Sequence, residues 1–359
     1  MTQLSEAVAN PTSAPGRVVV LRTLVVASAG GWLFSHLHIP LGWLLGALFA
    51  TIIGTRLFSA VHVPRLMRDL VSPVLGVLIG SSFTPALLGQ IGQWPVPVAV
   101  TLGYAVLIST LGFLYFRRAA RLDVMTALFA GLPGGLSEMT LLGVALGARA
   151  NVLAVVHSLR IVMIVVIMPF IIGFMARPAP GAAFAGKPPL GMVDIALLVA
   201  CGLGGFALSR VVRMPAGALL LPLGLSAAVH LTGVTGGAPP LWIVAPAQIV
   251  VGAYIGVRFM GMAFRHMLPM VGHGVAWGFI MIAAAIGLAV FASRVFAGVE
   301  RLPLMLALSP GGMSEMSLLT LSVGVDVAFV ITCHMMRIVT VFLCAPVVAR
   351  LVASRGNRS

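Results

Sequence analysis

The chain has 359 residues, of which 60% are hydrophobic and only 8% are charged, and its mean hydropathy is +1.12. A soluble core could not bury so many uniformly apolar helices, so the composition excludes a soluble globular domain and predicts a polytopic helical membrane protein. The formal net charge of +14 lies mainly in short arginine-containing connections between apolar segments, as in cytoplasmic loops. No hydrophilic segment is long enough for a separate DNA-binding domain, so we expect no direct nucleic-acid partner.

The predicted elements begin after a polar N-terminal tail at residues 1–17. The first membrane repeat, 18–175, contains apolar segments at about 18–35, 41–58, 70–88, 95–116, 124–147 and 151–175, and a linker rich in Pro, Gly and Ala follows at 176–190. The second membrane repeat, 191–350, contains them at about 191–209, 215–232, 241–257, 267–292, 302–324 and 327–349, before a basic C-terminal tail at 351–359. Segments of this length are suited to a bilayer core of roughly 30 Å.

Two motifs occur once in each half of the chain. The sequence Pro-Gly-Gly-Leu-Ser-Glu-Met at 133–139 returns as Pro-Gly-Gly-Met-Ser-Glu-Met at 310–316. A His-x-x-Arg sequence at 157–160 likewise returns at 334–337. Repetition of this kind at a near-constant spacing predicts an internal duplication.

The relative orientation of the two halves has two solutions. If the segments 124–147 and 302–324 enter the membrane and return, each half crosses five times and the repeats are inverted. If both segments cross, the chain has twelve spans and parallel repeats. Counting basic residues in the loops does not separate these alternatives.

The distribution of charge between corresponding loops favours inversion. The arginine-containing connection at 56–68 corresponds to the uncharged 233–240, and the uncharged 89–95 corresponds to the basic 258–265. Halves of opposite orientation that obey one positive-inside rule exchange their charged loops in this way. We therefore expect about ten full spans and two broken or re-entrant helices.

The Pro-Gly-Gly sequences predict a break inside an apolar helix in each half. Proline and paired glycines end a half-helix, and Ser137 or Ser314 is then placed to cap the next one, with Glu138 or Glu315 in its first turn. A carboxylate is stabilised there by the positive end of the helix dipole. The structural interpretation is a capped kink; the functional one is a carboxylate that binds a cation or carries a proton, or free backbone N–H groups that bind an anion.

The His-x-x-Arg sequences predict a polar stripe on an otherwise apolar span, because residues three apart share a helix face. Arg160 and Arg337 lie well inside predicted spans, and the glutamates of the two motifs are their natural partners. The structural interpretation is a buried ion pair that fixes helix packing. In the functional one, the arginine holds an anionic substrate or modulates the glutamate, and His157 or His334 titrates near neutral pH.

Other acidic residues are expected near the membrane surface. Asp123 and Glu300 occupy matching positions and are expected to cap helix starts. Asp326 matches Arg149 in the first half, so a strictly symmetric site cannot include it.

The doubled Pro-Gly-Gly-x-Ser-Glu-Met motif, followed by His-x-x-Arg, resembles the bacterial AbrB-type integral membrane family from about residue 20 onward. That resemblance implies a duplicated hydrophobic region. Family members have been labelled both regulators of gene expression and ammonia monooxygenases. An oxygenase needs clustered histidine and carboxylate ligands, and the eight histidines here are scattered, so we do not expect that activity. The family-like Gly-x-Asp is kept at 324–326 and lost at 147–149.

We therefore predict an all-α, polytopic, multi-pass protein of the bacterial inner membrane, with two homologous halves that are inverted repeats. The expected function is ion-coupled secondary transport or export of a small solute, without enzymatic activity or cofactor. The alternative is a non-transporting membrane regulator or sensor that affects gene expression indirectly. Expected partners are the lipid bilayer, a small solute, a proton or sodium ion, and a second copy of the chain. The predicted substrate- and ion-binding residues, none of them a metal site, are Gly134, Gly135, Ser137, Glu138, His157, Arg160, Gly311, Gly312, Ser314, Glu315, His334 and Arg337.

Overall fold

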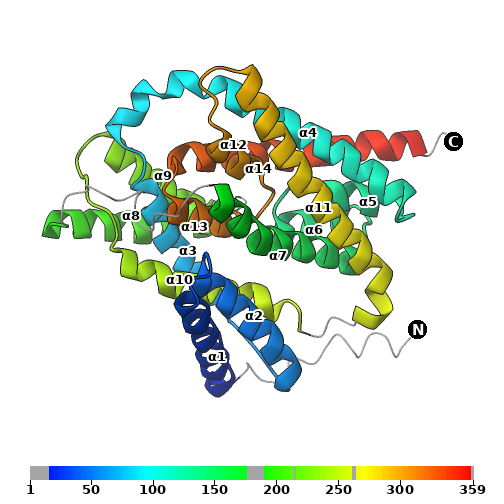
Figure 1. Ribbon diagram of the computed structural model, residues 1–359, viewed down its shortest axis with the longest axis horizontal. Coiled ribbons are helices and arrows are strands. Elements are labelled where there is room, and N and C mark those ends of the chain that lie inside the picture. The colour runs from blue at the N-terminus through cyan, green and yellow to red at the C-terminus, as the bar shows by residue number, and fades with distance from the viewer. Residues whose placement is uncertain (1–15, 176–189, 213, 215, 261–263, 357–359) are drawn as a thin grey trace. The chain divides into compact units, whose positions relative to one another are not determined.

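The computed structural model describes residues 16–175, 190–212, 214, 216–260 and 264–356, and every regular element in these ranges is helical (Figure 1). The first part of the chain forms α1 (Arg17–His36), α2 (Gly42–Leu57), α3 (Arg65–Gly80), α4 (Pro95–Arg118), α5 (Val124–Gly131), α6 (Leu136–Ala145) and α7 (Ala150–Met175). The second part forms α8 (Met192–Val211), α9 (Gly217–Leu231), α10 (Val244–Val257), α11 (Phe264–Val295), α12 (Arg301–Leu308), α13 (Met313–Val323) and α14 (Val327–Gly356). The predicted all-α fold class is confirmed.

Six of the described helices are long and apolar enough to cross a membrane. They are α1, α4, α7, α8, the Leu268–Val295 part of α11 and the Val327–Val352 part of α14. These six fall at matching places in the two successions of helices, since α1, α4 and α7 correspond to α8, α11 and α14. α2, α9 and α10 are shorter apolar helices. The inverted orientation of the halves stays a prediction.

The outward faces of α1 and α8 are apolar. Val18 and Leu21 on α1 are 76% and 64% exposed, and Met192 and Leu203 on α8 are 85% and 66% exposed. In water, such continuous apolar faces would drive association. In a bilayer they contact lipid chains, which identifies the chain as an integral membrane protein.

α3 differs from its predicted range, and α14 continues beyond its predicted end at 349 to Gly356, into the segment expected as the C-terminal tail. The apolar segment expected at 70–88 ends earlier, because α3 stops at Gly80 and the chain continues through short 3₁₀ turns η1 (Pro85–Gly89) and η2 (Ile91–Gln93). Ser81 and Ser82 follow Gly80 and compete for backbone hydrogen bonds, and Pro85 has no N–H to donate to a continuing helix, so the helical ladder ends here. α3 instead begins early, at Arg65, directly after Pro64.

The chain divides into two compact units that do not coincide with the predicted halves. One comprises 1–68 and 245–262, and the other comprises 69–244 and 263–359. In the first unit, α1 meets α2 so closely at Gly30 and Gly46 that a Cβ atom on Gly46 would overlap the carbonyl of Gly30. α10 packs on α2 in the same way, because a Cβ atom on Gly252 would overlap the carbonyl of Leu44.

The second unit holds both broken helices. Among its described elements, α7 packs on α5, α6, α11 and α13, while α14 packs on α4, α12 and α13. Figure 1 shows α11 running alongside α7. Trp277 of α11 is fully buried and stacks on Tyr115 of α4 at 5.7 Å between ring centroids. The two half-helix pairs are therefore clamped between long helices.

Candidate site at the two helix breaks

Each Pro-Gly-Gly sequence separates two half-helices. α5 ends at Gly131 and α6 begins at Leu136, while α12 ends at Leu308 and α13 begins at Met313. The last residue before each second half-helix is extended, with φ −65° and ψ 142° at Gly135 and φ −71° and ψ 151° at Gly312. The predicted breaks are confirmed in both halves.

The glutamates, but not the serines, occupy their predicted places. Glu138 and Glu315 lie in the first turn of α6 and α13. The N-cap positions belong to Gly135 and Gly312, which carry no capping side chain, so the expected serine caps are wrong. Each serine is already inside the helix, because the second glycine supplies the extended backbone that a helix start requires.

The two glycines of each motif leave space for the side chains of the methionine and the glutamate of the same motif. A Cβ atom on Gly134 would lie 2.6 Å from Cγ of Met139, and one on Gly311 would lie 2.5 Å from Sδ of Met316. On the second glycine of each copy, a Cβ atom would overlap Oε2 of the glutamate three residues later. The first glycine thus accommodates the methionine, and the second lets the carboxylate fold back over the start of the half-helix.

Arg160 binds the chain at the first break. It projects from α7 and is 2% exposed. Nη1 donates to the carbonyl of Leu132 at 3.0 Å, and Nη2 donates to the carbonyl of Gly134 at 2.6 Å. These carbonyls directly follow α5, where helix ends leave C=O groups unpaired and the dipole is negative. A buried cation is thereby placed where the backbone favours it.

Arg337 does the same at the second break. It projects from α14 and is 1% exposed. Its Nη1 lies 3.3, 3.2 and 3.1 Å from the carbonyl oxygens of Ala307, Leu308 and Ser309, at the end of α12. Charge-assisted hydrogen bonds of this kind are stronger than neutral ones. In both halves an arginine therefore donates to backbone carbonyls at the end of the first half-helix, although these carbonyls do not all come from matching positions of the repeat.

The expected ion pairs between these arginines and the motif glutamates are not formed among the described residues. The reason is positional: each arginine reaches the carbonyl end of the first half-helix, whereas each glutamate lies at the amide end of the second. Opposite charges thus face the two opposite dipole ends that meet at a break.

The histidines of the His-x-x-Arg pairs are both completely buried. Nε2 of His334 lies 3.0 Å from the carbonyl oxygen of Leu306 in α12. Nδ1 of His334 and Nε of Arg160 and of Arg337 have no hydrogen-bond partner among the described residues, and the ring of His157 interacts weakly with the backbone of Phe129. Buried polar atoms are normally paired, so this region holds an unusual concentration of unused donors and acceptors.

The surface-side starts of the half-helices differ between the halves. Asp123 caps α5 by accepting a 2.8 Å hydrogen bond from the Thr126 N–H, as predicted, and its other oxygen forms a 3.1 Å ion pair with Arg149. Partial burial acts to raise the pKa of Asp123, but the Thr126 hydrogen bonds and the Arg149 charge outweigh it and lower the pKa below its ordinary value.

In the second half, two acids replace that ion pair. Glu300 precedes α12 but makes no capping hydrogen bond, contrary to expectation. Asp326 accepts a 3.0 Å hydrogen bond from the Phe329 N–H at the start of α14. Both acids line a polar cavity of about 140 Å³ together with Gln90 and Gln93. Burial raises the pKa of Asp326, although backbone hydrogen bonds act in the opposite direction.

Fold and site together define a polytopic all-helical membrane protein with a helix broken at Pro-Gly-Gly in each half. Residues 43–353 match the family described as "Transition state regulatory protein AbrB", so the chain belongs to the AbrB family. The resemblance drawn from the doubled motifs is confirmed.

Two relatives span nearly the whole chain. One is "Uncharacterized protein YhjN" of Bacillus subtilis (strain 168), 26% identical over 355 residues that cover 91% of each chain. The other is "Putative regulator AbrB" of Escherichia coli (strain K12), 24% identical over 329 residues that cover 89% of this chain and 92% of the relative. No solved structure matches the chain significantly.

Removal of either buried arginine is expected to destabilise its helix break. Arg160→Met or Arg337→Met leaves carbonyls at the end of a half-helix without a donor, at a cost on the order of 1.5–3 kcal/mol. Thermal denaturation of the detergent-solubilised variants measures the effect. Arg294→Met, at an exposed position near the end of α11, is the matched control. Equal melting temperatures for all three variants would contradict the carbonyl-anchoring role.

The two aspartates are expected to give opposite pH dependences. The lowered pKa of Asp123 means that its contribution to stability is present above the ordinary aspartate pKa of 3.8 and is lost as the pH falls. The raised pKa of Asp326 means that its contribution is present below that value and is lost as the pH rises. In a plot of melting temperature against pH, Asp123→Asn should reduce the loss of stability as the pH falls. Asp326→Asn should reduce the loss of stability as the pH rises. Wild-type profiles in both variants would refute this assignment.

Proposed function

We propose that this AbrB-family protein is an ion-coupled secondary transporter or exporter of a small solute in a bacterial inner membrane. The coupling ion is a proton or sodium, the chain catalyses no chemical reaction, and it needs no cofactor. The observation that carries the proposal is the presence of two helices broken at corresponding positions, each with charges of opposite sign at the two ends that meet. Broken helices at matching places in two halves mark the substrate and ion sites of many transporters.

In this proposal the motif glutamates bind or relay the cation. Glu138 and Glu315 are half-buried, whereas the arginines that support the breaks are almost completely buried. Ionisable side chains at membrane depth are costly and are usually retained for ion or proton pathways. The carboxylates fold back over Gly135 and Gly312, so cation binding and the geometry of the break are linked through the same few atoms.

The solute would use the remaining polar atoms of the site. The Gly134 and Gly311 backbones supply peptide groups, Ser137 and Ser314 supply hydroxyls, and the His-x-x-Arg pairs supply buried nitrogens without protein partners. In a low-dielectric interior each unused donor or acceptor favours a polar ligand. A small polar solute suits this set better than an apolar one.

A regulator is the second candidate, and its support is the naming of the family and of the Escherichia coli relative. Those names speak of regulation, and for this chain they favour a membrane sensor that affects gene expression indirectly. A sensor binds its ligand without moving it across the membrane. Movement of the ligand across the membrane therefore distinguishes a transporter from a sensor.

Counterflow in proteoliposomes tests the proposal. The purified protein is first screened by thermal shift against amino acids, organic acids, sugars and nucleosides. Each stabilising compound is then loaded into vesicles, and uptake of the same labelled compound is followed with and without a proton or sodium gradient. A transporter accumulates label transiently, and Glu138→Gln/Glu315→Gln should abolish the gradient dependence. Glu300→Gln, which lies away from the breaks, is the matched control.

Binding without exchange in the wild type would contradict transport and support the sensor. Exchange that persists unchanged, with the same gradient dependence, in the double glutamate variant would leave transport standing and refute the assigned ion site.

The second glycine of each motif is expected to position the carboxylate rather than stabilise the fold. Gly135→Ala/Gly312→Ala should displace the glutamates and reduce gradient-driven uptake by about tenfold, which corresponds to about 1.4 kcal/mol. The fold should survive, because only the flexible end of a side chain must shift. Gly103→Ala on α4, where a Cβ atom meets nothing within 4 Å, is the control. Unchanged uptake in the double alanine variant would refute the positioning role.

A further inference from the structure

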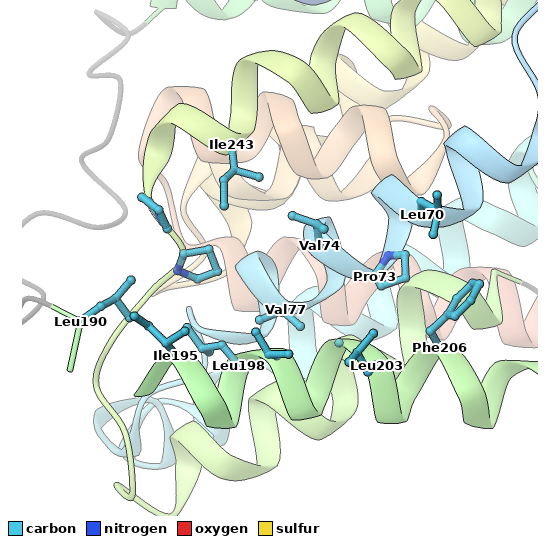
Figure 2. Close-up of a pocket in the computed structure, with 14 residues that line it drawn as sticks. Leu70, Pro73, Val74, Val77, Leu190, Ile195, Leu198, Leu203, Phe206 and Ile243 are labelled. Carbon is cyan, nitrogen blue, oxygen red and sulfur yellow. The ribbon is translucent and has the colours of Figure 1, made fainter. Parts of the chain in front are cut away.

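A second site lies away from the helix breaks, in a groove between α3 and α8. Figure 2 shows Leu70, Pro73 and Val77 of α3 facing the groove from one side, and Leu198, Leu203 and Phe206 of α8 facing it from the other. The cavity measures about 330 Å³, and all fourteen residues that line it are Leu, Ile, Val, Pro, Phe or Gly. Its chemistry suits a hydrocarbon and offers nothing to a polar solute.

The groove lies at membrane depth. α8 is a candidate membrane span, and its lining residues extend from Ile195 to Phe206. At 1.5 Å per residue this wall is roughly 17 Å long, close to the half-thickness of a bilayer core of about 30 Å. The exposed apolar side chains of α8, including Val199 and Leu203 within the groove wall, make the groove continuous with the lipid-facing surface.

The two ends of α8 carry opposite charges. Arg210 is exposed in the last turn, and its guanidinium lies 4.7 Å from the ring centroid of Phe206, which forms the end of the groove wall. Asp194 lies in the first turn, beyond the other end of the wall, and accepts hydrogen bonds from Thr235 and from the Gly191 N–H. A ligand with one anionic end is attracted to the Arg210 end and repelled from the Asp194 end.

We propose that the α3–α8 groove binds an anionic phospholipid, with one acyl chain in the groove and the phosphate against Arg210. This orientation places the phosphate one helical turn outside the apolar wall, which is where the interface begins relative to the hydrocarbon core. An anionic phospholipid of the surrounding bilayer fits the length of the groove, its apolar lining and the charge of Arg210. The site is independent of the transport proposal, since none of its residues belongs to the helix breaks.

Native mass spectrometry of the full-length protein tests the site. The probes are phosphatidylglycerol and phosphatidylcholine with the same acyl chains. The wild type should retain phosphatidylglycerol in preference, and Arg210→Gln should reduce that preference about fivefold, the effect of one basic residue at a membrane surface. Arg294→Gln, at the exposed end of α11, should leave the preference unchanged.

A groove-filling variant tests the acyl-chain part. A Cβ atom on Gly202 meets only Cγ2 of Val77, at 3.6 Å, so Gly202→Phe should occupy the groove and remove the bound lipid of either headgroup. Gly224→Phe on α9, where a Cβ atom meets nothing within 4 Å, is the matched control. Each variant is first compared with the wild type by thermal denaturation in lipid-free detergent.

Three results would overturn the proposal. The first is lipid retention in Gly202→Phe equal to that of the wild type. The second is an Arg210→Gln variant with an unchanged headgroup preference. The third is a wild type that forms a dimer and a Gly202→Phe variant that is a monomer with its lipid retained, which would assign the groove to a second copy of the chain.

Discussion

The arrangement depends on one constraint: a helix that stops in an apolar interior leaves backbone carbonyls and amides that need polar partners. The chain meets this constraint with charge at both sides of each break. Arg160 and Arg337 donate to the carbonyls that end α5 and α12. Glu138 and Glu315 lie at the amide ends of α6 and α13, where the dipole favours an anion. The two repeated motifs thus have complementary roles: the arginine of His-x-x-Arg stabilises the carbonyl end of each break, and the glutamate of Pro-Gly-Gly-x-Ser-Glu-Met stabilises the amide end.

The same solution connects stability to function. An arginine whose hydrogen bonds are directed to backbone carbonyls holds the break in place and is not committed to a carboxylate. In the proposed transporter, the carboxylate at the other side is the group whose charge responds to a proton or cation. The second glycine of each motif lies against that carboxylate, so the proposal links a change in its charge to the backbone at the start of the half-helix. An ion-coupled site requires a linkage of this kind.

The sequence predicted the parts of this structure that depend on local chemistry. Apolar length predicted the membrane class, and Pro-Gly-Gly predicted the breaks, because proline and glycine act through their own backbone. It failed for Ser137 and Ser314, because glycine precedes each serine and already supplies the extended cap residue. The sequence also predicted a glutamate as the partner of Arg160. Every residue has a backbone carbonyl, so a sequence does not indicate which carbonyl an arginine will contact, whereas it does show where the acidic side chains are. The groove on α8 depends on which helix packs beside it, so no pattern along the chain could reveal it. By contrast, the replacement of Arg149 by an acid at the matching position 326 was visible in the repeat alignment.

The most direct measurement is the thermal stability of the purified protein as a function of proton and sodium concentration, compared between the wild type and Glu138→Gln/Glu315→Gln. If the glutamates at the breaks are the responsive charges, one of the two cations raises the melting temperature of the wild type with saturation, by mass action on the folded state. The double variant should then lose this saturable response and keep only the pH dependence that Asp123 and Asp326 contribute. A wild-type response that is unchanged in the double variant, or a wild type whose only response is the pH dependence of those two aspartates, would contradict the account.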